Sequence, residues 1–227
     1  MTTETDICNM ALTQVGAGTI DSYNDENTKA ATTCRLWYPI ARDEVLEEFP
    51  WRFAKTTKAL ALTDEDPKEW SYSYTYPNDC LKVHYVIPTF DNEDQFNDLR
   101  SEFRDYTLNE VAYEVGYGTD SSPRILCNTE DAFIAYTKRV TSTALFNPMF
   151  ITMLSWKLAS YLAEPMGGDN NQRHRAYAEA KYQQESQKAM AKAANEANKG
   201  VQRLPNSLKV AHSRSALDTR VGSTFWR

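Results

Sequence analysis

The spacing of hydrophobic residues changes twice along the 227-residue chain, and this change limits the possible folds more than any other feature. The first apolar residues recur at the spacing of one helix face: Ile7, Met10, Ala11 and Val15. Gly16 ends this run. A second helical stripe follows: Ala30, Cys34, Trp37, Tyr38, Ala41, Val45 and Phe49. Pro50 closes this segment, and Pro39 predicts a kink or two abutting helices, because proline removes a hydrogen bond within a helix.

Between about residues 51 and 140 the period falls to two, which is typical of strands with one buried face. Apolar and polar residues alternate in Trp70–Tyr76, Leu81–Ile87 and Val111–Tyr117, and Phe133–Val140 is a fourth expected strand. Turn-forming residues separate these runs. Since no helix is predicted between them, we expect a mostly antiparallel sheet.

Helical spacing returns after Asn147, which with Pro148 is typical of a helix N-terminus. This helix presents a wide apolar face: Phe150, Met153, Leu154, Leu158, Tyr161 and Leu162. Residues 164–168 break it, and Asp169 with Gln172 is expected to cap a last helix that runs to Lys199 and stops at Gly200. The stripe of that helix is small: Ala178, Tyr182, Ala189, Ala193 and Ala197. We therefore expect it to pack on the bundle and to contact a neighbouring subunit.

These patterns predict an α+β fold. N-terminal helices (1–50) and C-terminal helices (141–200) form a bundle, a mostly antiparallel β domain (51–140) is inserted between them, and residues 201–227 form an extended tail. The net charge is −6, but residues 199–227 hold six basic residues and one acidic residue. That segment carries +5 and the first 198 residues carry −11, which is typical of a chain that binds a partner through its tail.

The tail combines basic and apolar residues in a way that suits docking of an extended chain into pockets. The expected docking residues are Arg203, Leu204, Leu208, Lys209, Val210, Arg214, Leu217, Arg220, Phe225, Trp226 and Arg227. Because aromatic side chains are frequent anchors of interfaces, Phe225 and Trp226 are expected to contribute most.

The four cysteines are far apart, so we expect buried, reduced thiols rather than a metal site or a disulfide framework: Cys8, Cys34, Cys80 and Cys127. The first residues contain no secretory signal, and no run approaches the ~18 apolar residues of a membrane span. Folding in cytoplasm is therefore expected.

Candidate catalytic and binding motifs are weak. Gly16-Ala17-Gly18 lacks the context of a phosphate loop, and the acidic loops 64–69 and 91–98 lack the glycine of an EF-hand. Glu44, Glu47 and Glu48 are expected to lie on a solvated helix face. The histidines have no plausible triad partners nearby in sequence: His84, His174 and His212. The ladder Trp70, Tyr72, Tyr74 and Tyr76 lies in an acidic stretch, which favours sheet core or subunit contact over base stacking.

Three segments in order carry a family resemblance: DICNMALTQVGAGTIDSYND at 6–25, AATTCRLWYPIARDEVLEEFPWRFA at 30–54 and YSYTYPNDCLKVHYV at 72–86. The second contains Tyr38-Pro39, Arg42-Asp43-Glu44, Leu46, Pro50-Trp51 and Phe53-Ala54. The third contains Tyr72, Tyr74, Tyr76-Pro77 and Asp79-Cys80-Leu81. Residues 6–90 thereby resemble the tail tubular protein A family of short-tailed phages, and the alanine-rich last helix agrees with this.

The resemblance implies a structural virion protein that is not an enzyme and holds no cofactor or metal. Members form a dodecameric ring that joins the portal protein to the tail nozzle protein, and double-stranded DNA passes through the ring without sequence-specific binding. The chain would then be assembled in host cytoplasm and reside in the virion below the portal vertex, with no role for a membrane. Two alternatives stay open: a virion-associated hydrolase and a general nucleic-acid binder.

Within this hypothesis the basic tail docks on the portal. Exposed loops at the end of an inserted sheet are expected to face the nozzle. Their acidic residues are Asp64, Glu65, Asp66, Asp91, Glu93 and Asp94. A third turn, 117–123, is expected to join them.

Overall fold

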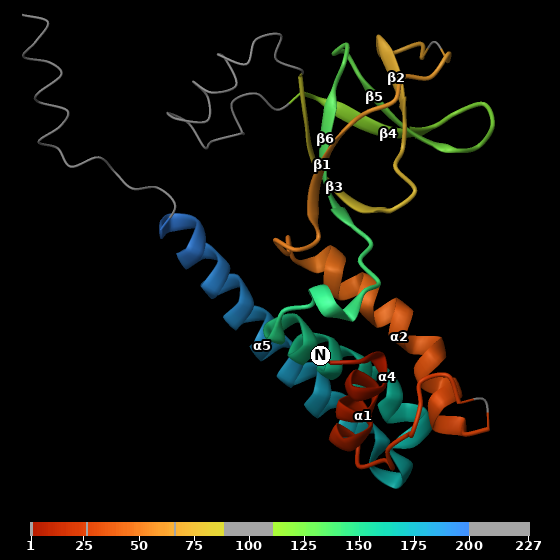
Figure 1. Ribbon diagram of the computed structural model, residues 1–227, viewed down its shortest axis with the longest axis vertical. Coiled ribbons are helices and arrows are strands. Elements are labelled where there is room, and N and C mark those ends of the chain that lie inside the picture. The colour runs from red at the N-terminus through yellow and green to blue at the C-terminus, as the bar shows by residue number, and fades with distance from the viewer. Residues whose placement is uncertain (1, 26, 66, 89–110, 200–227) are drawn as a thin grey trace, which may run out of the picture. The chain divides into compact units, whose positions relative to one another are not determined.

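The computed structural model describes residues 2–25, 27–65, 67–88 and 111–199, with side chains up to Lys192. Two compact units divide the chain, Met1–Met190 and Ala191–Arg227, and the contacts discussed below lie in the first. Helices come first, then strands, then helices again (Figure 1). Every strand pairing among these residues is antiparallel, so the predicted α+β fold with an antiparallel β part is confirmed.

Helix α1 (Glu4–Gln14) contains the first predicted helical stripe and ends just before Gly16, as its sequence predicts. The Thr3 hydroxyl accepts a hydrogen bond from the Asp6 amide, and the Asp6 carboxylate accepts one from the Thr3 amide, so that two free donors at the helix start are satisfied. Gly16 follows with a φ of 74°, a left-handed conformation that glycine adopts without strain. The buried face comprises Ile7, Cys8, Ala11 and Leu12.

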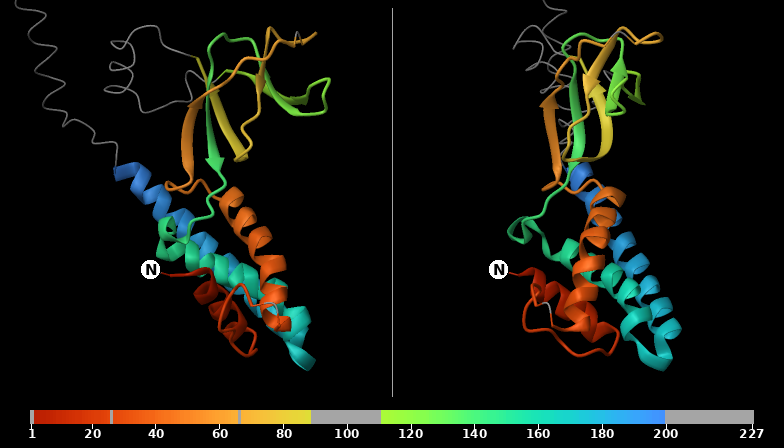
Figure 2. Two further views of the ribbon diagram at one scale, coloured as in Figure 1. Left: turned by 45° about the vertical axis from the view of Figure 1, so that its right-hand side comes forward. Right: turned by 90° about the vertical axis from the view of Figure 1, so that its right-hand side faces the viewer.

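Helix α2 (Lys29–Glu48) runs without interruption through Pro39, so the alternative of two abutting helices is wrong. Tyr38 and Ala41 are buried on either side of the proline, and α2 packs along α4 (Pro148–Met166). This tertiary packing holds one helix together despite the missing backbone hydrogen bond. Both views in Figure 2 show α1 and α2 beside α4, which contacts both helices.

Helix α4 starts as predicted, because the Asn147 side chain accepts a hydrogen bond from the Phe150 amide at 2.7 Å. It ends at Met166, before the short 3₁₀ turn Gly168–Asn170. Helix α5 (Asn171–Lys199) follows directly. The expected cap at Asp169 is wrong, because that residue lies within the 3₁₀ turn, and the Gln172 amide donates to the side chain of Asn171 instead.

Two three-stranded sheets make up the described residues of the β part. One has the order β1 (Lys55–Ala59), β6 (Phe133–Lys138), β3 (Cys80–Ile87), and the other has the order β2 (Tyr72–Thr75), β5 (Pro123–Cys127), β4 (Tyr113–Tyr117). Their shared core contains Tyr74, Val86, Ile125, Cys127, Ala132, Ile134 and Tyr136. This core is separate from the core of the helices.

The alternation rule fails at three strands for physical reasons. β1 (KTTKA) has no apolar alternation and forms through its pairing with β6, and β5 is a central strand whose apolar run Ile125, Leu126 and Cys127 is continuous. In β3, Val86 is fully buried although alternation places it on the polar side. A register shift between Val83 and Tyr85 causes this difference, because an extra residue moves later side chains to the opposite face.

The helical core is built around a cluster of four aromatic rings. Phe150 is fully buried, and its ring lies 5.2 Å from Trp51, 5.2 Å from Phe53 and 4.5 Å from Phe146, measured between centroids. The contacts of Phe150 with Trp51 and Phe53 join residues far apart in sequence. The helical core therefore extends past residue 50 and includes the segment that leads into β1.

Candidate interaction surfaces

The first candidate region is the junction where the chain passes between helices and sheets. The Trp51 indole donates a hydrogen bond to the Val45 carbonyl at 2.8 Å, and this bond fixes the chain as it leaves α2. One turn later the Ala54 carbonyl accepts a hydrogen bond from the Lys138 amide at 2.8 Å, at the end of β6. The segment that leads from α2 into β1 and the end of β6 are thus joined side by side.

Charged groups reinforce this junction. Asp43 on α2 accepts two hydrogen bonds from its buried neighbour Arg42, at 2.8 and 2.7 Å, and forms an ion pair with Arg139 at 3.0 Å. The Arg139 amide in turn donates to the Asp79 carbonyl at 2.7 Å, and Leu81 packs against the helical core. Side chains and backbone from both halves of the chain therefore meet at one place.

The second candidate region is the inward face of α5. Ala178, Tyr182 and Ala189 are buried in the chain's own helical core, so their predicted role as subunit contacts is wrong. These small and aromatic side chains recur on one face of the helix, and that face is occupied by the chain's own core residues. Ala193 and Ala197, from the same predicted stripe, lie outside the described side chains.

Half-buried polar groups link α5, α4 and α2 along this face. Glu44 accepts hydrogen bonds from the Tyr161 hydroxyl at 2.6 Å and pairs with the Lys157 ammonium at 2.9 Å. One turn along α2, Glu48 accepts hydrogen bonds from the hydroxyls of Tyr182 and Ser186. The ammonium of Lys157 also lies over the Tyr161 and Tyr182 rings. We call these residues, Glu44, Glu48, Lys157, Tyr161, Tyr182 and Ser186, the three-helix polar network.

The electrostatics of this network favour an ionised Glu44. Burial raises its pKa, but the hydrogen bonds from Tyr161 and Lys157 and the charge of Lys157 outweigh burial, so the pKa of Glu44 is lowered overall. Burial and the hydrogen bond to Glu48 raise the pKa of the Tyr182 hydroxyl. A general acid for hydrolysis needs a raised carboxyl pKa, and the shift at Glu44 has the opposite sign. Glu44 and Glu48 keep solvent exposure, as the sequence predicts, but they also accept hydrogen bonds from side chains of other helices, which the sequence does not predict.

Replacing Tyr182 with phenylalanine tests the network. We expect the free energy of unfolding to fall by about 1–2 kcal/mol, because Glu48 loses a donor while the buried ring is kept. Tyr177→Phe is the matched control: Tyr177 lies on the same helix and is 53% exposed, so its change should stay within about 0.5 kcal/mol. Urea denaturation measures both, and equal effects of the two substitutions would contradict a stabilising role for the bond to Glu48.

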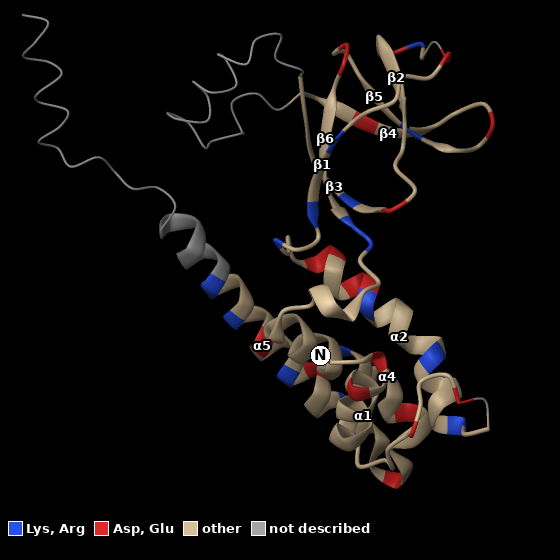
Figure 3. Cartoon of the chain, in the orientation of Figure 1, with Lys and Arg blue, Asp and Glu red and all other residues tan. Residues whose placement is uncertain are grey.

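The third candidate region is the loop end of the second sheet, where loop 63–71 meets the β4–β5 hairpin. The Glu65 carboxylate accepts hydrogen bonds from the amide and hydroxyl of Thr119 at 2.9 and 2.6 Å, and pairs with Arg124 at 3.3 Å. Arg124 also pairs with Asp120 at 3.1 Å. Figure 3 shows acidic and basic positions together on these loops. Glu65 is therefore held by its partners, whereas the sequence predicts a solvated turn.

The backbone approaches this cluster closely at Gly118. A Cβ atom there would lie 2.6 Å from the Glu65 carboxylate and 2.9 Å from the Arg124 guanidinium. Beside the cluster, Tyr117 is 79% exposed and Asp64 is exposed. The loop end thus presents an aromatic ring and acidic groups on a backbone that side chains hold in place. Asp66, Asp91, Glu93 and Asp94 lie outside the described residues.

The pH dependence of this loop end follows from its carboxyl groups. The hydrogen bonds from Thr119 lower the pKa of Glu65 from its ordinary 4.5, so its stabilising contribution is complete above pH 4.5 and is lost as the pH falls through the lower folded value. We expect the Thr119 amide proton, followed by NMR, to titrate with a midpoint below 4.5. Glu65→Gln should abolish that transition. A midpoint at or above 4.5 would contradict the pairing.

The aromatic ladder is mainly structural. Tyr74 is buried and its hydroxyl donates to the Thr129 carbonyl at 2.7 Å, while the Trp70 indole donates to Glu114 at 3.0 Å. The Tyr72 hydroxyl donates to Glu130 at 3.4 Å. Nearby acidic partners make this surface unsuitable for nucleic-acid bases, as the sequence predicts.

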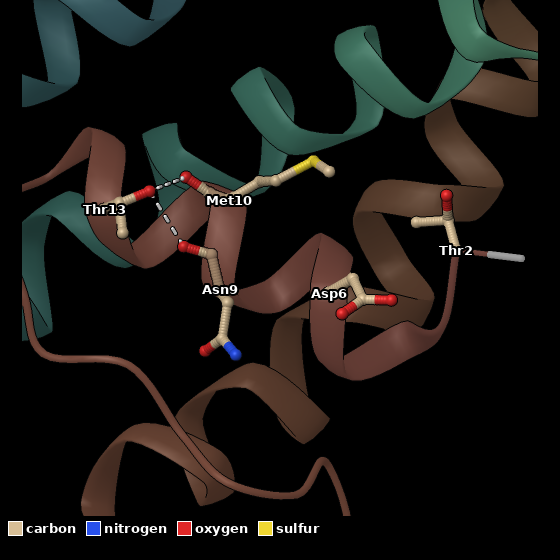
Figure 4. A pocket seen from close by; sticks show the side chains of 5 residues that line it. All are labelled: Thr2, Asp6, Asn9, Met10 and Thr13. Atoms are coloured by element: carbon tan, nitrogen blue, oxygen red, sulfur yellow. Dashed lines mark hydrogen bonds between the residues drawn. The ribbon is translucent and has the colours of Figure 1, made fainter.

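A shallow hollow of about 580 Å³ lies along the outer side of α1 and is lined by Thr2, Asp6, Asn9, Met10 and Thr13 (Figure 4). Three of its polar side chains are already engaged. Asp6 caps the helix, Asn9 exchanges two hydrogen bonds with the Ile20 backbone, and the Thr13 hydroxyl donates to backbone carbonyls of α1. Such a hollow offers few groups for recognising a ligand.

Other chemical groups are dispersed. Within the described ranges, no three His, Cys, Asp or Glu side chains come close enough together to hold a metal ion. His84 shares a hydrogen bond of 2.9 Å with the Thr137 hydroxyl, and burial together with the charges of Lys55 and Lys82 lowers its pKa. All predicted docking residues of the tail, from Arg203 to Arg227, lie outside the described residues.

Comparison with models of known protein families finds no match, and comparison with curated proteins finds no significant similarity. In the part of the chain that the structure describes, no helix is long and apolar enough to cross a membrane.

Proposed function

We propose that this chain is a structural adaptor of a short-tailed phage virion, one subunit of a dodecameric ring between the portal protein and the tail nozzle protein. The ring lets double-stranded DNA pass without reading its sequence. The chain acts as a connector and not as an enzyme. Its basic C-terminal tail binds the portal, and the loop end of the second sheet contacts the nozzle.

One observation carries the proposal: several of the residues that carry the resemblance to the tail tubular protein A family lie at the junction. Trp51 and Ala54 fix the outgoing chain, Asp43 pairs across to Arg139, and Asp79 holds the returning backbone. Residues confined to one helix surface would not be spread over positions 43 to 79. Residues that together build one helix-to-sheet junction would be. Part of the resemblance therefore rests on residues with a shared structural role.

Charge supports the same function. The first 198 residues carry −11, and a negative surface repels phosphate groups, so DNA would slide through the ring rather than bind to it. The segment 199–227 carries +5 and suits an acidic portal surface. Twelve copies of one tail bind with high avidity even when each contact is weak.

Mixing the purified full chain with isolated portal tests the proposal. We expect electron micrographs to show a ring of this protein on one face of the portal, and sedimentation to show the matching gain in mass. A stable monomer that does not bind the portal would overturn the proposal. Turnover of cell-wall material that disappears with one carboxylate substitution would favour the hydrolase instead.

A further inference from the structure

The two sheets carry opposite charge. Residues 52–60, 80–87 and 133–139, which contain the first sheet (β1, β6 and β3), hold six basic residues and no acidic one. Residues 61–76 and 111–131, which contain the second sheet (β2, β5 and β4), hold eight acidic residues and two basic ones. Figure 3 shows basic positions on β1 and β3 and acidic positions on β4 and the loops around it. One β part therefore has a basic sheet and an acidic sheet.

Strand β4 lies at the edge of the acidic sheet, with β5 as its neighbour. The Gly118 amide donates a hydrogen bond to the Ser122 carbonyl at 2.8 Å, and from this pair onward bonded and unbonded residue pairs alternate along the two strands. The backbone groups of Val115 and Tyr117 therefore point away from β5, and no described residue pairs with them there. Val115 is 47% exposed, and Glu114 beside it is also exposed. This edge is thus open and acidic.

Strand β1 lies at an edge of the basic sheet, with β6 as its neighbour. The Leu60 amide donates a hydrogen bond to the Ala132 carbonyl at 2.9 Å, so by the same alternation the backbone groups of Thr57 and Ala59 point away from β6. No described residue pairs with those groups. Thr57, Lys58 and Ala59 are all exposed. This second edge is open and basic.

We propose that β4 of one copy of this chain pairs with β1 of the next copy, so that hydrogen-bonded strands cross the subunit boundary. Both strands have five residues, and each presents backbone donors and acceptors that a second strand can satisfy. Lysines on an edge strand discourage pairing with another basic or apolar strand, whereas Glu114 on β4 offers them an opposite charge. Like edges repel and unlike edges attract, so the copies associate head to tail.

A head-to-tail contact uses two different surfaces of each chain, and it closes into a ring when the rotation between neighbours fits. The inference deepens the proposed function and rests on it for the ring, because it names the strands through which the ring subunits meet. The pairing covers basic residues of β1, which agrees with a ring that lets DNA pass without binding it. The loop end of the second sheet lies beyond this edge and is not part of the contact.

Carbodiimide cross-linking tests the contact, because this reagent joins a lysine amine directly to a carboxylate. Unlabelled and heavy-isotope-labelled full chains are mixed, cross-linked with and without isolated portal, and digested. We expect mass spectrometry to find β1 peptides joined to β4 peptides of the other label. Rings on the portal without such links would exclude this contact and leave the adaptor function standing. Links without portal binding would support the contact and exclude the adaptor function, and the absence of both would exclude both.

Exchanging charges between the two edges gives a second test. Lys58→Glu and Glu114→Lys each place like charges at the contact, and we expect each to weaken assembly by about tenfold or more. Combining them in one chain restores opposite charges, so the double variant should return to within about threefold of the wild type. Lys68→Glu is the matched control, because Lys68 is exposed and lies outside both strands, and it should leave assembly unchanged.

Sedimentation velocity over a concentration series, with and without portal, measures assembly, and melting temperatures confirm that each variant folds. A double variant that assembles no better than the single variants would refute the strand pairing. The pairing would also be refuted if Lys58→Glu left assembly unchanged but removed salt-sensitive binding of a double-stranded DNA fragment. The basic sheet would then be a nucleic-acid contact instead.

Discussion

Replacing Phe150 with alanine is expected to lower the free energy of unfolding by about 3–5 kcal/mol. Its ring is fully buried and contacts the rings of Trp51, Phe53 and Phe146. Removal leaves a cavity whose walls come from α4 and from the segment between α2 and β1. Those walls are held by separate contacts, including the Trp51 bond to Val45, so they cannot close fully around the vacated space.

Urea denaturation followed by tryptophan fluorescence measures this effect, since Trp51 reports directly on the cluster. Leu145→Ala is the matched control, because Leu145 lies five positions earlier, is apolar and is 57% exposed. We expect its change to stay within about 0.5 kcal/mol. A loss below about 1 kcal/mol for Phe150→Ala would show that the aromatic cluster does not anchor the helical core.

Deletion of residues 201–227 is expected to weaken binding to the portal by at least about a hundredfold while leaving the melting temperature unchanged. Binding falls because the basic charges and both terminal aromatic residues are removed, and avidity multiplies the loss over many subunits. The fold is spared, because the helical and β cores both consist of residues before Met190. Surface plasmon resonance with immobilised portal measures the affinity.

Two variants separate the contributions within the tail. Trp226→Ala removes only an aromatic anchor, and we expect a smaller loss of about tenfold that persists at high salt. Arg214→Ala removes only charge, and its effect should diminish as salt screens the interaction. Unchanged affinity of the truncated chain would exclude the tail as the portal contact while leaving a ring adaptor possible.

Local signals predicted the helices well. The start of α4 depends on the side chain that directly precedes it, so Asn147 marks this boundary in the sequence itself, whereas the Thr3 cap of α1 was not predicted. Pro39 shows the limit of such signals. Its lost hydrogen bond is a local cost, but packing of α2 against α4 outweighs that cost, and this packing is invisible in the sequence around the proline.

Long-range contacts decided the candidate surfaces. The sequence placed Glu65 on an exposed acidic loop, and only the tertiary structure brings Arg124, 59 residues away, against it. The sequence also placed Ala178, Tyr182 and Ala189 on one face of a helix. It did not show which partner covers that face. The chain's own α2 and α4 cover it, because hydroxyls on α5 reach Glu48 and the small side chains fit the core.

By itself, the sequence determined the α+β class, the order of helical and strand regions, the C-terminal end of α1, the start of α4, and the separation of an acidic body from a basic tail. These features follow from periodicity and capping, which involve residues close together in sequence, and from net charge, which is a sum over a whole segment. Only the tertiary structure decided how β1 and β5 pair and which partners cover the inward face of α5. Those outcomes depend on contacts between distant segments, and no local pattern encodes which segments will meet.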